Sequence, residues 1–435
     1  MVQSSVKIKA GPHLYSGESG PRIVWTHVGA LWLVVVVSAG FFGWSSLMVL
    51  AAAVGTSVAI DLALSRLASS RNPASLPHAA LTGLLVGLSL PVMTDMGLML
   101  RIAVTAAAVA SLLGKWMFGG MGHYIWHPAL VGILAVHFLF PTEVGKVGRD
   151  EHFGPDHREK YLLLSNDSLL IGDLSRNQTP RTYQFGPQRS ELLQPNDYGG
   201  WSVSLPAEPA QAWRLYRPVQ ILQELARGDI KNPKPGSGFA PSAVEQAIYL
   251  AMPPLADAVV GSTGGGLGET SVVAILLGGL FLIYRGYIRW QLPVSFLFAA
   301  AVSAAVLPLP VGTSGEWVWL PALSGMGQAA AANSPADWWR LLAVGLTYVS
   351  FHLCSGGLML AAFFLANDMA TRPIRLSGQI IFGLGAGVLT IVARIYGGWA
   401  MAPLGAYSAL LVMNTLTPLI DWITRPKPRG RPSIV

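Results

Sequence analysis

The residues best suited to chemistry form one glycine-rich stretch, Asp257–Ser271, with the sequence DAVVGSTGGGLGETS. Its five glycines exclude a helix interior, since each costs about 1 kcal/mol there relative to alanine. Glycine lets the backbone approach a ligand, and the N–H groups of the helix expected next suit a phosphate. Ser262 and Thr263 add hydroxyls. The pattern suits either a phosphate-binding loop or a tight turn capped by Thr270 or Ser271, and these residues alone leave both hypotheses open.

Ionisable side chains within or near apolar segments are the second set of candidates, because such groups are costly in a membrane and usually functional. Two histidines lie near glycine pairs, and these six residues are Gly119, Gly120, His127, His352, Gly356 and Gly357. The other charged candidates are Asp61, Asp95, Glu269, Asp368, Arg394 and Asp421. Core packing is the alternative for His352. Solvated helix ends are the alternative for Asp61, Asp368 and Asp421, and a helix cap is the alternative for Glu269.

Composition indicates which elements position these residues. Of the 435 residues, 52% are hydrophobic and only 12% are charged, whereas soluble domains contain about 25% charged residues. A chain with so few charges is expected to lie in a lipid bilayer. The net charge of +7 does not predict a nucleic-acid partner, because the basic residues form short clusters between apolar runs. The single cysteine, Cys354, excludes an internal disulfide.

A membrane-spanning helix needs about 20 mostly apolar residues. The sequence predicts ten such segments, at 25–43, 46–65, 79–93, 97–114, 126–140, 268–286, 291–309, 338–365, 378–396 and 403–422. The segments 79–93 and 126–140 are short, which indicates tilted or broken helices. The predicted fold class is therefore an all-α polytopic membrane protein with a first membrane half at 1–140, an extracytoplasmic insertion at 141–253 and a second half at 254–435.

Basic residues in the loops predict the orientation. With ten helices, all of the following fall on one side: Lys7, Lys9, Arg22, Arg66, Arg71, Lys115, Arg285, Arg289, Arg372, Arg375, Arg425, Lys427, Arg429 and Arg431. The positive-inside rule makes that side cytoplasmic. We therefore expect an inner-membrane protein whose two termini are cytoplasmic and whose residues 141–265 are periplasmic.

The two halves echo each other. GGMGHYIWHPA at 119–129 opens the fifth predicted helix, and GGWAMAPLG at 397–405 opens the tenth. Because each half has an odd number of helices, the second half enters the membrane from the opposite side. This pattern predicts two inverted five-helix repeats with the functional centre at their interface. A small-solute channel or transporter without flavin would suit the same architecture, and it remains the rival hypothesis.

The stretch that begins at Asp257 resembles the flavinylation motif D-x-x-[S/T]-G-A-T, which FMN transferases recognise. Asp257 and Gly261 match the motif, and Thr263 matches the acceptor threonine. Val260 stands where serine or threonine is usual, and Ser262 where alanine is usual. A scaffold that has lost its flavin is therefore a third hypothesis.

Four further segments, at 115–132, 267–279, 355–373 and 406–421, are similar to the RnfD/NqrB family. In the first of them, Tyr124 and His127 replace asparagines that are usual in the family. The likeness covers both predicted membrane halves, and the short N-terminal region and the LGETS sequence that follows the acceptor favour RnfD over NqrB.

The resemblance implies a membrane subunit of an Rnf-type ferredoxin:NAD oxidoreductase, which couples electron transfer to Na⁺ or H⁺ movement and acts together with other Rnf subunits. It implies FMN joined covalently to Thr263 by an FMN transferase, and it allows a second, non-covalent flavin such as riboflavin. The implied cofactor-binding residues are Asp257, Gly261, Ser262, Thr263, Gly264, Gly265, Glu269, Thr270, Gly119, Gly120, His127, His352, Gly356 and Gly357. No catalytic residue and no metal ligand is expected in this chain.

Overall fold

The computed structural model describes residues 18–68, 72–91, 95–146, 193–195, 201–203, 219, 222, 244, 255–261, 265–311, 316–323, 335–397 and 404–425. The first membrane half contains α1 (Gly20–Phe42), α2 (Trp44–Leu67), α3 (Ser75–Ser89), α4 (Met96–Val109), the π-helix η1 (Ala110–Lys115), the 3₁₀-helix η2 (Trp116–Phe118), α5 (Pro128–Leu139) and α6 (Pro141–Lys146). These elements cover all five segments predicted for this half, and α3 and α5 are short, as the sequence indicates.

The second half contains α11 (Leu255–Val260), α12 (Val272–Tyr284), α13 (Gln291–Val306), the 3₁₀-helix η4 (Pro321–Leu323), α15 (Pro335–Cys354), α16 (Leu358–Leu360), the π-helix η5 (Ala361–Leu365), α17 (Leu376–Tyr396) and α19 (Gly405–Ile423). Two antiparallel hairpins add to the helices. One pairs β1 (Leu193–Pro195) with β2 (Trp201–Val203) inside the insertion, and the other pairs β3 (Leu309–Val311) with β4 (Glu316–Val318). Neither hairpin was predicted.

Local sequence accounts for several helix ends. Proline in the first turn of α1 suits a position whose N–H would have no partner. Gly43, with φ of 70°, ends α1 and permits the sharp corner into α2. The side chain of Asp95 accepts a hydrogen bond from the backbone N–H of Leu98 and caps α4. These signals begin and end the helices where the apolar runs begin and end.

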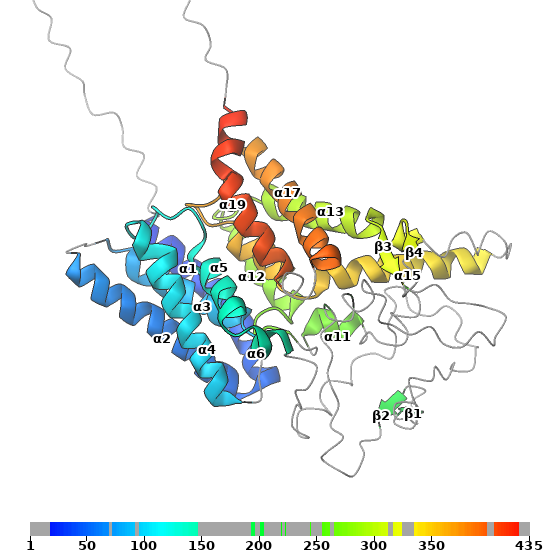
Figure 1. The fold of residues 1–435 in the computed structure, drawn as a ribbon, viewed down its shortest axis with the longest axis horizontal. Helices are drawn as coiled ribbons and strands as arrows, with labels where there is room; N and C mark the ends of the chain where they lie inside the picture. The colour runs from blue at the N-terminus through cyan, green and yellow to red at the C-terminus, as the bar shows by residue number, and fades with distance from the viewer. Residues whose placement is uncertain are drawn as a thin grey trace, which may run out of the picture.

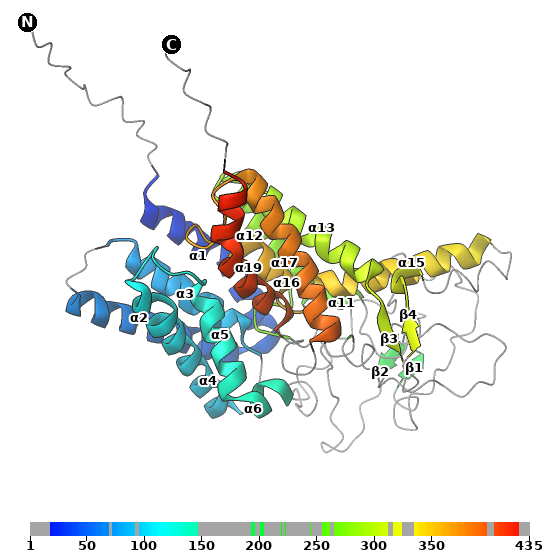
Figure 2. The same cartoon turned by 45° about the horizontal axis from the view of Figure 1, so that its top comes forward.

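The helices pack as two groups that meet along the middle of the molecule (Figure 1). In the first group α2 packs on α3 and α4, and in the second α17 packs between α13 and α19. The groups touch where α1 packs on α12 and where α5 packs on α19. The start of α1 and the end of α19 lie on the same side of the bundle, opposite α6 (Figure 2).

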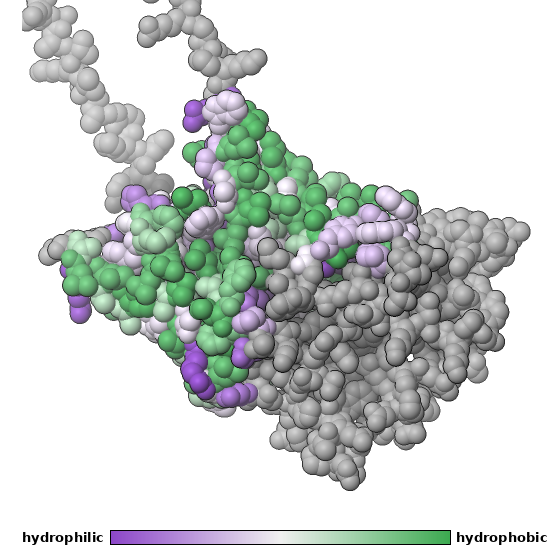
Figure 3. All heavy atoms as spheres, viewed as in Figure 1, coloured by the Kyte–Doolittle hydropathy of each residue, from purple (hydrophilic) through white to green (hydrophobic). Residues whose placement is uncertain are grey.

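The surface of the helices is mostly apolar, with polar residues gathered at its margins (Figure 3). Large apolar side chains such as Trp32, Trp44 and Phe298 are more than half exposed. Four helices, namely α1, α2, Met96–Phe118 and α17, are long and apolar enough to cross a membrane. A bent pair, Val344–Cys354 with Leu358–Leu365, raises this number to five among the described residues. The chain is therefore a multi-pass membrane protein.

The predicted span 338–365 is wrong as a single helix. It ends at Cys354 and resumes at Leu358 with a bend of 61°. Gly356 lies in the break and has a φ of 65°. Glycine suits this position, because a residue with a side chain would be strained at that angle. The total of ten spans, the inverted repeat, the domain boundaries and the orientation remain predictions.

Small residues allow α13 and α17 to pack closely, as they commonly do between membrane helices. A Cβ atom added at Gly387 would lie 2.7 Å from both Ala299 Cβ and Ala300 N. We expect Gly387→Ala to destabilise the protein by about 1–3 kcal/mol through overpacking. The matched control is Gly55→Ala, at an exposed helical position with nothing within 4 Å of the added Cβ. Thermal unfolding in detergent checks the pair, and equal melting temperatures for the two variants would contradict this packing.

Candidate functional site

The two ends of the glycine-rich stretch come together in the structure. Gly261 is buried with φ of 117°, and a Cβ atom there would lie 2.9 Å from Ser271 Cβ. Only glycine suits both that backbone angle and that contact. The stretch therefore closes on itself just before α12. We call Gly261–Ser271 the attachment loop; Ser262, Thr263 and Gly264 lie outside the described residues.

The attachment loop is bonded to the end of α3 in the first half. The backbone N–H of Leu267 donates to Leu90 O at 2.9 Å, and that of Gly268 donates to Leu88 O at 2.6 Å. These bonds satisfy carbonyl groups where α3 ends. The loop that the sequence predicts to carry a phosphate group is thus attached to the first membrane half as well as to the second.

Glu269 ties the attachment loop to α19. Its carboxylate accepts hydrogen bonds from the backbone N–H of Gly266, at 3.1 Å, and from the hydroxyl of Tyr407. Gly357 leaves room for this pair, because a Cβ atom at that position would meet the Tyr407 hydroxyl and lie 2.9 Å from Glu269 Oε1. One carboxylate therefore holds the turn of the loop against a neighbouring helix.

The capping alternative for this stretch applies to Ser271, whose hydroxyl accepts a hydrogen bond from the N–H of Ala274 at 3.3 Å. Glu269 is not the N-cap of α12. Thr270, the residue before Ser271, is buried. The methyl group of Thr270 would lie 3.1 Å from a Cβ atom added at Gly265. Asp257 lies in α11. Cofactor binding by these residues remains a prediction.

Arg394 caps the C-terminus of α15. Its guanidinium donates to the backbone oxygens of His352 and of Ser355, the latter at 2.7 Å. The side chain of His352 is buried and packs edge-on against Tyr348, with ring centroids 4.8 Å apart. Neither ring nitrogen of His352 has a hydrogen-bond partner within the described part of the chain. The geometry places Arg394 on helix carbonyls and His352 in a packed position.

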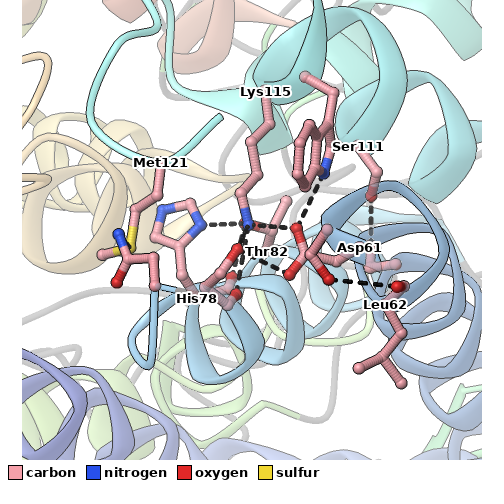
Figure 4. A network of polar contacts seen from close by, with 12 residues as sticks. Asp61, Leu62, His78, Thr82, Ser111, Lys115 and Met121 are labelled. Carbon is pink, nitrogen blue, oxygen red and sulfur yellow. Dashed lines mark hydrogen bonds and ion pairs between the residues drawn. The ribbon is translucent and has the colours of Figure 1, made fainter. Parts of the chain in front are cut away.

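A second polar centre lies in the first half, and we call Asp61, Ser75, Lys115 and Trp116 the lysine cluster (Figure 4). The Lys115 ammonium is 2.7 Å from Asp61 Oδ1 and also donates to Ser75 Oγ at 3.1 Å and Ser75 O at 3.2 Å. The Asp61 carboxylate further accepts from Ser75 Oγ at 2.8 Å and from Trp116 Nε1 at 2.9 Å. Both charged side chains are only 2% exposed.

This cluster corrects two sequence interpretations. Lys115 is not a surface charge of a cytoplasmic loop, and a solvated helix end does not explain Asp61. The π-helix η1 ends at Lys115, and it lies against α2 and α3. Single π turns inside α-helices are rare and frequently occur at functional sites.

The 119–127 segment joins the first half to the second. The Tyr124 hydroxyl is 2.8 Å from His78 Nε2 and donates to Asp368 Oδ1 at 3.3 Å. Trp126 Nε1 donates to Thr415 Oγ1 in α19 at 2.8 Å. The Asp368 carboxylate thus accepts a hydrogen bond from another part of this chain, so a solvated helix end does not fully explain it.

Other predicted residues in this segment have structural roles. The His127 ring caps α5 through a hydrogen bond from the N–H of Ala129 at 3.2 Å. Gly119 and Gly120 have φ of 103° and 97°, which a side chain would oppose. Ser75, His78, Lys115, Trp116 and Tyr407 were not among the predicted site residues. A signal was present in the Lys115-Trp116 pair at the end of an apolar run, but the partners lie far away in the sequence.

The buried pair Asp61–Lys115 yields a stability prediction. Removing one partner leaves an uncompensated buried charge, so we expect Lys115→Met or Asp61→Asn to cost about 3–5 kcal/mol each. The double variant removes both charges, and we expect it to be more stable than either single variant. Thermal or denaturant unfolding in detergent checks this double-mutant cycle. Additive losses would contradict a direct charge pair.

Comparisons with known proteins agree with the resemblance seen in the sequence. The model of the NQR2, RnfD, RnfE family matches residues 7–430. The D component of the proton-translocating ferredoxin:NAD(+) oxidoreductase complex of Clostridium ljungdahlii is 27% identical over 436 residues, 98% of each chain. The D component of the Na(+)-translocating ferredoxin:NAD(+) oxidoreductase complex of Acetobacterium woodii is 25% identical over 432 residues, 99% of this chain and 97% of the relative.

A third relative is the D component of the ion-translocating oxidoreductase complex of Klebsiella pneumoniae, 27% identical over 427 residues, 98% of this chain and 99% of the relative. These likenesses cover nearly the whole chain. With the family model covering nearly all of the sequence, the chain belongs to the NQR2, RnfD, RnfE family.

Proposed function

We propose that this protein is the RnfD-type membrane subunit of an ion-translocating ferredoxin:NAD oxidoreductase complex, and that it carries FMN covalently attached to Thr263. The observation that carries the first part is the end-to-end similarity to the D components of such complexes. The chain is then part of an oxidoreductase and translocase, and the other subunits of the complex are its partners. Its own task is to relay electrons between redox neighbours rather than to transform a substrate.

The second part of the proposal draws on the attachment loop. Thr263 lies two residues along the chain from Gly261 and two from Gly265. Gly261 is fixed against Ser271, and the turn after Gly265 is held by Glu269, Tyr407 and the end of α3. These residues fit a group bonded to the loop, because both sides of the acceptor segment are anchored to helices.

FMN would supply the redox chemistry at this place, and the chain would supply binding and position. The anchored loop limits where a covalently attached group can travel. Glu269 holds the N–H of Gly266 inward, so that the turn keeps its shape. The covalent bond itself would keep the cofactor from being lost to the outside.

We place the loop on the periplasmic face of the inner membrane, with both termini in the cytoplasm. In the structure, the start of α1 and the end of α19 lie on one side of the bundle, in agreement with this topology (Figure 2). Ten spans arranged as two inverted five-helix repeats complete the proposed architecture, although α3, α5, α12 and α13 are shorter than a full span.

The proposal includes one flavin. The segment 119–127 is similar to a family motif, but in this chain the Tyr124 hydroxyl contacts His78 and Asp368, and His127 caps α5. The polar atoms named here already have protein partners. A second, non-covalent flavin such as riboflavin stays a prediction of the resemblance.

Covalent attachment is tested by Thr263→Ala, expressed with an FMN transferase. We expect the denatured parent chain to fluoresce under ultraviolet light in a gel and the variant to lose that fluorescence, because the phosphodiester acceptor is gone. The matched control is Ser262→Ala, which removes the neighbouring hydroxyl and restores the alanine usual in the motif. It should keep the fluorescence.

Val260→Thr makes the motif more like the one that transferases recognise, and we expect the flavin content per chain to stay equal or rise. Mass spectrometry of the peptide that contains residue 263 identifies the modified residue. A parent chain that carries no flavin after expression with an active transferase would contradict the covalent-FMN part and would favour a channel, a transporter or a flavin-free scaffold.

A further inference from the structure

The ammonium of Lys115 lies among oxygen atoms that come from two other helices. Asp61 Oδ1, Ser75 Oγ and Ser75 O lie 2.7, 3.1 and 3.2 Å from Nζ. Asp61 comes from α2 and Ser75 from the first turn of α3, whereas Lys115 enters from the end of η1. The three N–H groups of a lysine match these three acceptors. The ammonium therefore has three acceptors within the protein.

We propose that these oxygens form a binding site for one partly dehydrated monovalent cation, and that Lys115 fills it as a cation tethered to the chain. A carboxylate, a hydroxyl and a backbone carbonyl are oxygen ligands of the kind that replace the hydration shell of an alkali ion. An alkali ion and an ammonium group carry the same charge. The site would thus accept Na⁺ or K⁺ if the lysine side chain were absent.

The oxygen cage does not depend on the lysine alone. Ser75 Oγ donates to Asp61 Oδ2 at 2.8 Å, and Trp116 Nε1 donates to Asp61 Oδ1 at 2.9 Å. Each carboxylate oxygen of Asp61 is therefore held by a donor other than Lys115, Oδ2 by Ser75 and Oδ1 by Trp116. Because the Ser75 hydroxyl hydrogen points to Asp61, its lone pairs remain available for a cation.

Charge and burial explain why the site holds a cation at all times. The Asp61 side chain is 2% exposed and carries one negative charge in an apolar bundle. An unpaired carboxylate is costly there. A tethered ammonium competes with free ions at a high effective concentration, since it never leaves the neighbourhood of the site. The parent chain should therefore take no alkali ion at this place.

Lys115→Ala in the purified full-length chain tests the proposal. We expect its melting temperature to rise in NaCl or KCl relative to choline chloride at equal ionic strength. The melting temperature of the parent should not rise in NaCl or KCl through ion binding at this site. The double variant Asp61→Asn/Lys115→Ala lacks the carboxylate and should lose the alkali-ion effect. Arg66→Ala removes a basic residue near the end of α2 outside the cluster and serves as the matched control.

Equilibrium binding of radioactive sodium, and of rubidium as a potassium analogue, gives a second measurement. We expect one additional alkali ion per chain in Lys115→Ala relative to the parent and to the double variant. Lys115→Gln keeps most of the side-chain length, so it replaces Lys115→Ala if the alanine variant does not fold. It should show the same rise in melting temperature with Na⁺ or K⁺, but with a lower affinity for the ion.

Equal stability of the lysine variants in alkali and choline salts, with no added ion bound, would overturn the proposal and leave the lysine cluster as an ion pair only. The same gain in the parent or in Arg66→Ala would also overturn it, because the effect would then arise elsewhere. None of these outcomes depends on flavin content, so this test and the test of covalent FMN fail independently.

Discussion

Polar groups inside this apolar bundle are costly to leave without a partner in the protein, because lipid offers none. The same cost applies to backbone atoms wherever a helix is interrupted. The breaks after α15 and after η5 expose carbonyl groups that a continuing helix would have satisfied. Arg394 donates to two carbonyls at the end of α15, and Asn367 donates to Ala362 O and Phe363 O at 2.9 and 3.1 Å. Each break thus comes with a buried polar side chain that stabilises it.

The two polar centres follow from this constraint in different ways. In the lysine cluster, a full positive and a full negative charge offset each other, and two neutral donors complete the carboxylate. At the attachment loop, Glu269 binds one backbone N–H and one hydroxyl. The first centre holds helices of one half together. The second holds a loop against both halves, which suits a segment proposed to present a covalently bound group at a constant position.

The contacts between the two halves include both apolar packing and hydrogen bonds. Apolar packing joins α1 to α12, hydrogen bonds join the attachment loop to α3, and Tyr124 and Trp126 reach the second half from the 119–127 segment. These contacts place the lysine cluster and the attachment loop within one packed bundle.

The sequence by itself determined the membrane class, the family and the approximate positions of the described helices other than the broken one at 335–365, because apolar runs and local motifs are properties of neighbouring residues. It also predicted that α3 and α5 are short. Its alternative interpretation of the glycine-rich stretch, a turn capped by Thr270 or Ser271, applies to Ser271, which caps α12. Tertiary structure decided which polar groups meet. Lys115 and Asp61 are 54 residues apart, and Glu269 and Tyr407 are 138 apart. No local pattern encodes such pairs, since they arise only when helices from distant parts of the chain pack and exclude water from the charges between them.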